Sequence, residues 1–210
     1  MIIDKNFVFI HIPKTGGTWM RQALRLLPTF EHEYAGHRLK IPIEHQHKPV
    51  FTLVRNPWDL YVSSYTHFHH NFTKKINEFD PKNRHAESKK FLSERFGGSF
   101  SDMLHHIDFY QDFMSRSYEH LDGIYRVLRY ENGLATELFS FLEELKVQIS
   151  APTRARIEQL ANSRFNSHQQ HRKPGGYYDE ALEAIVARND AFVIDFWQYS
   201  CPPELKTSRD

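Results

Sequence analysis

The sequence predicts an α/β fold, a single three-layer domain in which a central parallel sheet lies between two layers of helices. Three short apolar runs, at 6–12, 50–54 and 124–128, are rich in β-branched and aromatic residues and indicate strands. Segments with helical apolar spacing follow them. Strands that alternate with helices imply a parallel sheet covered on both faces. The length suits one domain at 1–210, because no repeat or linker-like run divides the chain.

The expected elements alternate along the chain. The first half is expected to hold a strand at 6–12, a helix at 18–27, an irregular stretch to about 49, a strand at 50–54 and a helix at 57–68. Pro57 suits the first turn of that helix, and Asn56 before it is a good cap. The second half is expected to hold helical pieces at 86–95 and 99–109, a strand at 124–128, a helix at 134–145, a short helix from Pro152 and a helical tail at 179–199 that breaks near 189–190.

The composition indicates a globular protein without a general affinity for nucleic acid. Apolar residues make up 40% of the chain and aromatic residues 14%, which is typical of a chain that builds a core. The net charge of +1 gives no global attraction to a polyanion. No run approaches the roughly 18 apolar residues that a membrane span needs. Asp4 and Lys5 lie inside the first apolar stretch, which indicates a strand rather than a secretory signal.

The cysteine and histidine content argues against disulfides and metal sites. The sole cysteine, Cys201, excludes an internal disulfide and fits a reducing, cytoplasmic compartment. Fourteen histidines include the clusters His67-x-His69-His70 and His45-x-His47. Adjacent or alternating histidines rarely form a closed tetrahedral set without further ligands, and no companion cysteines are present. We therefore expect no metal.

The most informative segment is residues 7–19, where a predicted strand passes through a glycine turn into a helix. An apolar run stops at a proline, a lysine and two glycines follow, and helical spacing begins at Met20. Unpaired backbone N–H groups and the helix dipole converge at such a helix start and make an anion pocket. Lys14 adds a positive charge, and the hydroxyls of Thr15 and Thr18 add donors. The expected ligand is a phosphate-like group.

A loop that binds ATP or GTP does not fit this spacing. That loop needs four residues between its first glycine and a Gly-Lys-Ser/Thr triplet. In this chain Lys14 precedes the glycines, and no Gly-Lys pair occurs anywhere. A P-loop kinase or nucleotide hydrolase is therefore the weaker interpretation. A non-catalytic module that binds nucleotides or polyanions is a further alternative.

A second strand-to-helix segment contains another candidate anion-binding pair. Arg55 stands at the carboxyl end of the strand at 50–54, and Ser63 lies about two helical turns into the helix that follows. A guanidinium fork and a hydroxyl suit a phosphate, although Arg55 could also pair with Asp59 at the helix start. Ligands of parallel sheets bind beyond the carboxyl ends of the strands, where both segments are expected to lie.

Together the two segments resemble motifs of the sulfotransferases that use 3′-phosphoadenosine 5′-phosphosulfate (PAPS), in particular carbohydrate-type and bacterial members. Pro-Lys-Thr-Gly-Gly-Thr-Trp at 13–19 is similar to their 5′-phosphosulfate loop. Arg-x-Pro-x-Asp from Arg55, with Ser63 eight residues on, is similar to their 3′-phosphate motif. The motifs occur in the family's order. The resemblance implies a P-loop-like α/β fold and transfer of a sulfuryl group from PAPS to a hydroxyl, which leaves 3′,5′-adenosine bisphosphate.

The resemblance also implies a donor site. It places on the 5′-phosphosulfate the residues Lys14, Thr15, Gly16, Gly17 and Thr18. It places Trp19 near the adenine, and Arg55 and Ser63 on the 3′-phosphate. Arg172-Lys173-Pro174-Gly175-Gly176, within 164–178, resembles the loop that closes over the nucleotide. Pro174 stands where the family often has glycine, so Arg172 is a firmer assignment than Lys173 or Gly175. Arg129-Tyr130-Glu131 resembles a strand end of the family and is interpreted as architectural.

The chemistry implied by the family is positioning plus electrostatic stabilisation, as in phosphoryl transfer. Lys14 is expected to stabilise the leaving oxygen. The attacking hydroxyl needs a base, which the family supplies as histidine or glutamate between or just after the two motifs. His37 follows Gly36 in a Gly-His pair like that of several carbohydrate sulfotransferases, and an imidazole suits a base near neutrality. Glu31 and Glu33 are the alternatives.

The acceptor is expected to be a hydroxyl on a carbohydrate, and a small phenol or alcohol is the alternative. Residues 69–110 are polar and longer than a tight connection requires. They are therefore the expected acceptor-binding insertion.

Overall fold

In the computed structural model the chain forms two compact units, Met1–Arg55 with Arg116–Asn166, and Asn56–Ser115 with Ser167–Asp210. The structure describes residues 1–34, 40–75, 99–105, 123–162 and 176–207. The predicted helix at 86–95, most of the expected insertion at 69–110 and most of the expected closing loop at 164–178 lie outside these residues. The prediction of one domain over 1–210 stays a prediction.

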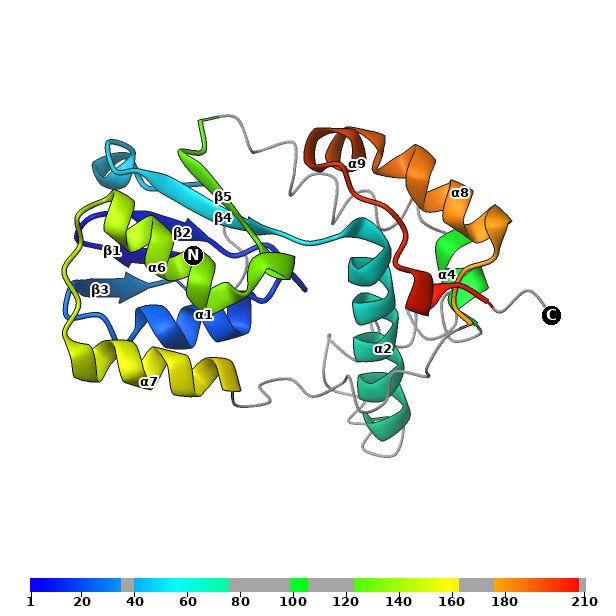
Figure 1. Cartoon of the computed structure of the whole chain (residues 1–210), viewed down its shortest axis with the longest axis horizontal. Coiled ribbons are helices and arrows are strands. Elements are labelled where there is room, and N and C mark those ends of the chain that lie inside the picture. The colour runs from blue at the N-terminus through cyan, green and yellow to red at the C-terminus, as the bar shows by residue number, and fades with distance from the viewer. Residues whose placement is uncertain (35–39, 76–98, 106–122, 163–175, 208–210) are drawn as a thin grey trace, which may run out of the picture. The chain divides into compact units, whose positions relative to one another are not determined.

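The first unit is built on a five-stranded sheet with the order β3-β1-β2-β4-β5 (Figure 1). Its strands are β1 (Ile2–Asp4), β2 (Val8–Ile10), β3 (Phe30–Glu33), β4 (Val50–Val54) and β5 (Arg126–Arg129). β2, β4 and β5 run parallel, whereas β1 is antiparallel to β2 and to β3. The α/β class is confirmed with a mixed sheet around a parallel core, so the expectation of a purely parallel sheet is wrong.

The antiparallel strand follows from a tight turn that the sequence analysis missed. Residues 5–7 join β1 to β2, a connection too short for a parallel crossover. The buried Asp4 carboxylate holds this turn, because it accepts hydrogen bonds from the Asn6 amide at 2.8 Å and from Thr29 Oγ1 at 2.7 Å. The apolar run expected as one strand at 6–12 is therefore preceded by a separate strand. β3 lies in the stretch that was expected to be irregular.

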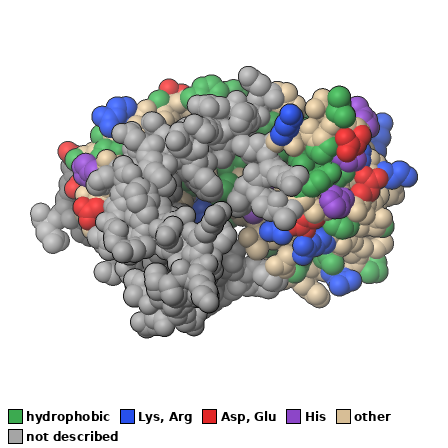
Figure 2. Space-filling model, turned by 180° about the vertical axis from the view of Figure 1, so that it is seen from behind, with side chains coloured by type: hydrophobic (Ala, Val, Ile, Leu, Met, Phe, Trp, Pro, Cys, Tyr) green, Lys and Arg blue, Asp and Glu red, His purple; other side chains and the backbone are tan. Residues whose placement is uncertain are grey.

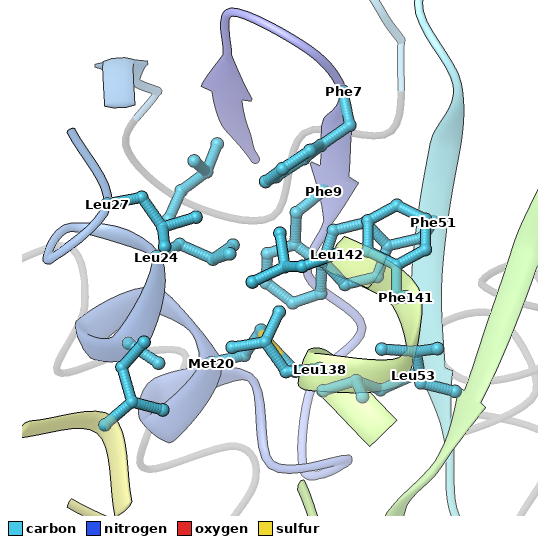
Figure 3. Close-up of a cluster of buried hydrophobic side chains, with 14 of the residues drawn as sticks. Phe7, Phe9, Met20, Leu24, Leu27, Phe51, Leu53, Leu138, Phe141 and Leu142 are labelled. Atoms are coloured by element: carbon cyan, nitrogen blue, oxygen red, sulfur yellow. The ribbon is translucent and has the colours of Figure 1, made fainter. Parts of the chain in front are cut away.

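Helices α1 (Gly17–Leu24), α6 (Leu134–Glu144) and α7 (Ala151–Asn162) share one apolar core with the sheet. Figure 3 shows side chains of α1 and α6 meeting those of β2 and β4. The ring centroids of Phe51 and Phe141 lie 4.4 Å apart, and Phe7 packs edge-on against both rings. Rigid aromatic packing of this kind fixes the sheet against α6, so the strand ends are held in place.

The opposite face of the sheet is buried as well. Its core residues are Met1, Ile3, Val8, Ile10 and Val50. Side chains that lie outside helices pack against this cluster within the described residues: Tyr34, Ile41 and Ile124. The expected second layer of helices stays a prediction. The 3₁₀ helices η1 (Ile43–His45) and η3 (Tyr130–Asn132) also belong to this unit.

The second unit contains α2 (Pro57–Lys75), α4 (Phe100–His105), α8 (Glu180–Asn189), α9 (Ala191–Trp197) and the 3₁₀ helix η5 (Pro203–Leu205). The expected cap is confirmed, because Asn56 Oδ1 accepts a hydrogen bond from the Trp58 amide at 3.1 Å. The Tyr178 hydroxyl donates to the Trp58 carbonyl at 2.9 Å and ties α2 to the segment before α8. The predicted break at 189–190 is confirmed, since Asp190 separates α8 from α9.

Asp190 is a buried carboxyl at this break. It accepts a hydrogen bond from the Tyr61 hydroxyl at 2.8 Å, and the pair is buried. Burial raises the pKa of Asp190 to about 6, although the Tyr61 hydrogen bond opposes this shift. The folded chain therefore binds this proton more tightly than the unfolded chain does. Its contribution to the free energy of unfolding is greatest below pH 4 and falls as the pH rises to about 6.

We predict that Asp190→Asn removes this pH-dependent term, because the amide oxygen still accepts from Tyr61 but carries no charge. The difference in free energy of unfolding between Asp190→Asn and wild type should grow in favour of the variant from pH 4 to pH 6 and then stay level. Its size should be about 3 kcal/mol, as expected for a carboxyl whose pKa rises by about two units. Urea unfolding at a series of pH values measures it, with Asp195→Asn on the exposed side of α9 as the control. A difference that does not vary with pH would contradict the assignment.

Candidate functional site

The predicted strand–turn–helix is present at the carboxyl end of β2. The chain turns at residues 13–16, and α1 begins at Gly17. Gly16 is the N-cap residue with φ of 96°, in the left-handed region that favours glycine. Its carbonyl accepts the first helical hydrogen bond, from the Met20 amide at 3.1 Å. Within the described residues no side chain caps this helix start, and an uncapped helix start of this kind can bind an anion through its first amides.

Close packing explains both glycines. A Cβ built on Gly17 would lie 1.7 Å from Cδ2 of His11, so only glycine lets α1 begin against the end of β2. A Cβ on Gly16 would lie 2.8 Å from Cδ1 of Leu134 and 3.0 Å from Cδ2 of Tyr130. The glycines therefore bring the helix start close to the ends of β2 and β5 and to the first residue of α6, whatever ligand the loop binds.

The two threonines of the loop differ in their surroundings. Thr15 is fully buried, and its hydroxyl donates to the Ile12 carbonyl at 2.8 Å. That hydrogen is used inside the turn, so Thr15 contributes to the shape of the loop and can offer a ligand its backbone N–H. Thr18 is half-buried in the first turn of α1. Its hydroxyl is therefore the better placed of the two for an anion at the helix start.

Lys14 and Arg55, predicted from separate motifs, lie side by side. β2 and β4 are parallel neighbours, so the residues that follow them meet at the same edge of the sheet. Arg55 Nη1 donates to the Lys14 carbonyl at 2.8 Å, and the Arg55 side chain is only 6% exposed. Lys14 itself adopts φ of 65°, which is uncommon for lysine. The carbonyl that Arg55 holds therefore belongs to a residue with an unusual backbone.

The electrostatics of this pair favour an anion. Burial and, to a smaller extent, the nearby Arg55 charge together lower the pKa of Lys14 to about 8. Two cations close together in a partly buried place repel each other, and an anion between them would relieve that repulsion. Binding of a phosphate-like group should therefore raise the pKa of Lys14 again.

Tyr130 is a third component that sequence reasoning interpreted as architectural. It opens η3 directly after β5, at the same edge of the sheet as Lys14 and Arg55. The Arg55 guanidinium carbon lies 4.3 Å from the centroid of its ring, a cation–π contact. The Arg-Tyr-Glu pattern at a strand end was the available signal, but nothing in it indicates a contact with Arg55.

The remaining predicted donor residues belong to the core of the first unit, to the second unit, or to the part of the chain outside the described residues. Trp19 is 7% exposed and belongs to the core of the first unit, which by itself explains a tryptophan there. Ser63 is half-buried on α2 of the second unit. Outside the described residues lie His37, Arg172, Lys173 and Gly175.

Both glutamates considered as alternative bases are held in ion pairs. Glu33 on β3 pairs with Arg21 and Arg25 of α1, and Arg25 Nε donates to its carboxylate at 2.7 Å. Glu31 pairs with Lys48 at 2.8 Å. The Lys48 hydrogen bond holds the pKa of Glu31 below its usual range. A carboxylate stabilised in its charged form is a weaker base, so this ion pair argues against Glu31 as the base.

Figure 2 shows that acidic and basic side chains are interspersed over the coloured part of the face in view. Among the described residues, no three His, Cys, Asp or Glu side chains come together as a metal ion would require. None of the helices in the described ranges has the length and apolar character of a membrane-spanning segment.

Comparison with protein-family models and with curated proteins returns no match for this chain. The functional assignment therefore depends on the two motifs and on the geometry of the loop.

We predict that Gly17→Ala destabilises the first unit, because the added methyl group overlaps the His11 ring. The free energy of unfolding should fall by about 1–3 kcal/mol, as is usual for overpacking in a close-packed interior. In a His11→Ala background the same substitution should cost much less, because the overlapping ring is gone. Denaturant unfolding of the four proteins of this cycle measures the coupling. An equal cost of Gly17→Ala in both backgrounds would contradict the proposed clash.

Proposed function

We propose that this protein is a sulfotransferase that moves a sulfuryl group from PAPS to an acceptor hydroxyl. The observation that carries the proposal is the meeting of Lys14 and Arg55 at the carboxyl ends of β2 and β4. Each comes from a motif that resembles one half of a PAPS site, and the two motifs are 41 residues apart in the chain. Two cations beside an uncapped helix start suit a donor that carries several negative charges.

The residues present fit such a donor. The Lys14 ammonium group and the first amides of α1, from Gly16 to Thr18, would hold the 5′-phosphosulfate. The Arg55 guanidinium remains our proposal for the 3′-phosphate, and Ser63 is the second residue that the sequence motif assigns to that group. Arg172, Lys173 and Gly175 remain our proposal for the loop that closes over the nucleotide, and Trp19 for the adenine.

In the proposed reaction the acceptor oxygen attacks sulfur in line, and the bond from sulfur to the bridging oxygen breaks. The acceptor proton passes to the base, for which His37 is our candidate. The electron pair of the broken bond stays on the bridging oxygen, which becomes part of the 5′-phosphate of 3′,5′-adenosine bisphosphate. Lys14, as the ammonium ion, stabilises that charge. Its pKa of about 8 leaves it mostly protonated at neutral pH, and the bound anion raises the protonated fraction further.

We propose a carbohydrate hydroxyl as the acceptor, with a small phenol or alcohol as the alternative. The sequence features behind this choice are the Gly-Gly-Thr loop, the Gly-His pair and the Tyr-Tyr-Asp segment at 177–179. Tyr178 of that segment is fully buried and Asp179 caps α8, so both also have a structural role.

We predict that Lys14→Ala lowers the rate of sulfuryl transfer by roughly 10²–10³, the usual cost of removing one donor to a developing negative charge. Lys146→Ala is the matched control, because Lys146 is an exposed lysine that also adopts a positive φ, of 55°. Transfer of labelled sulfate from PAPS to a set of carbohydrate and phenolic acceptors measures both variants.

Undiminished transfer by Lys14→Ala would remove this lysine from the mechanism. Binding of 3′,5′-adenosine bisphosphate without turnover on any acceptor would favour a non-catalytic nucleotide-binding module instead.

A further inference from the structure

Arg55 is held on two sides by residues of its own unit. Its Nη1 atom donates to the Lys14 carbonyl at 2.8 Å, and its guanidinium carbon lies 4.3 Å from the centre of the Tyr130 ring. Only 6% of the side chain is exposed. The planar guanidinium can make the two contacts at once, because its face stacks on the Tyr130 ring and its edge donates to the Lys14 carbonyl. Arg55 therefore links β5 to the loop that follows β2.

Arg55 donates to the carbonyl of Lys14 itself. The orientation of this carbonyl is tied to the backbone conformation of Lys14, from which the lysine side chain extends. Lys14 has φ of 65°, and a residue with a side chain keeps such a backbone only where its surroundings enforce it. A hydrogen bond from a buried guanidinium is a strong constraint of this kind. It fixes the peptide group between Lys14 and Thr15, and with it the direction in which the Lys14 side chain leaves the loop.

Tyr130 supports the same loop from a second direction. The ring that carries the Arg55 guanidinium also lies against Gly16, where an added Cβ would meet its Cδ2 atom at 3.0 Å. The Tyr130 side chain thus lies against both Gly16 and Arg55, the arginine that donates to the Lys14 carbonyl. Loss of the ring would release both contacts together.

We propose that Arg55 and Tyr130 are positioning residues for Lys14. Seated on the Tyr130 ring, the Arg55 guanidinium holds the Lys14 carbonyl and so fixes where the Lys14 ammonium group meets the anion. This inference rests on the proposed function for the identity of the anion. It gives Arg55 a role at the 5′ end of the donor, in addition to its expected contact with the 3′-phosphate.

The first arm of the test needs no ligand. Selective ¹³C labelling of lysine side chains allows the Lys14 titration midpoint to be followed by NMR, with Lys14→Ala to assign the signal. Arg55→Gln should raise the midpoint from about 8 toward the ordinary lysine value, because it removes one cause of the depression and loosens the buried loop. Tyr130→Leu should shift it in the same direction, whereas Tyr130→Phe, which keeps the ring, should retain the wild-type midpoint.

The second arm separates the two ends of the donor. Adenosine 5′-phosphate has no 3′-phosphate for Arg55 to contact, so a purely 3′ role predicts that its affinity is unchanged in Arg55→Gln. The positioning role predicts that Arg55→Gln and Tyr130→Leu both weaken its binding by about 10- to 100-fold, the equivalent of one charge-assisted hydrogen bond. Calorimetric titration measures this, beside 3′,5′-adenosine bisphosphate as the second ligand.

The outcomes are distinguishable. A Lys14 midpoint that is the same in wild type, Arg55→Gln and Tyr130→Leu overturns the positioning role, as does unchanged affinity for adenosine 5′-phosphate in these variants. If Arg55→Gln does not fold, the pair Tyr130→Leu and Tyr130→Phe decides alone, and equal midpoints for the two overturn the proposal. Failure of the wild-type protein to bind either nucleotide would instead contradict the proposed function, while the titration of Lys14 would still decide the positioning role.

Discussion

The hydrogen bond from Arg55 to the Lys14 carbonyl is the interaction on which the candidate site depends. It joins the residues that follow two neighbouring parallel strands, β2 and β4, across the edge of the sheet where ligands of α/β proteins bind. Without it, the left-handed backbone of Lys14 would lose a constraint, and a direct link between the two motifs would be lost. The aromatic core beneath the sheet makes this bond possible, because it holds β2 and β4 in register against α6.

The close approach of the Lys14 and Arg55 side chains is electrostatically unfavourable, because both are positively charged. Burial of the Lys14 ammonium group, together with the nearby Arg55 charge, lowers the pKa of Lys14 to about 8. Perturbed pKa values of this kind cluster at functional sites, and a bound anion would supply the opposite charge here. Gly16 and Gly17 let α1 begin close to the end of β2, so that the first amides of this helix lie in the same loop as Lys14. Ordering two glycines has an entropic cost.

Sequence reasoning could predict those parts of the fold and site that local rules decide. The strand at 50–54, the Asn56 cap and the break at 189–190 all follow from propensity and capping, and the structure has them. The N-terminal stretch was expected to be a strand, but the turn that makes β1 antiparallel to β2 was missed, because the Asp4 side chain that holds it depends on Thr29, far away in the chain. The contact of Tyr130 with Arg55 was missed for the same reason, since it forms only after β4 and β5 have paired.

The most direct test of the central claim is a backbone amide NMR titration of the wild-type protein with 3′,5′-adenosine bisphosphate and, separately, with magnesium ATP. If Lys14 and the start of α1 form a site for a doubly phosphorylated adenosine, the amides of Gly16, Gly17 and Thr18 should show the largest shifts, and the bisphosphate should saturate them at lower concentration than ATP. Unperturbed loop amides at saturating bisphosphate, or tighter binding of magnesium ATP, would contradict the account.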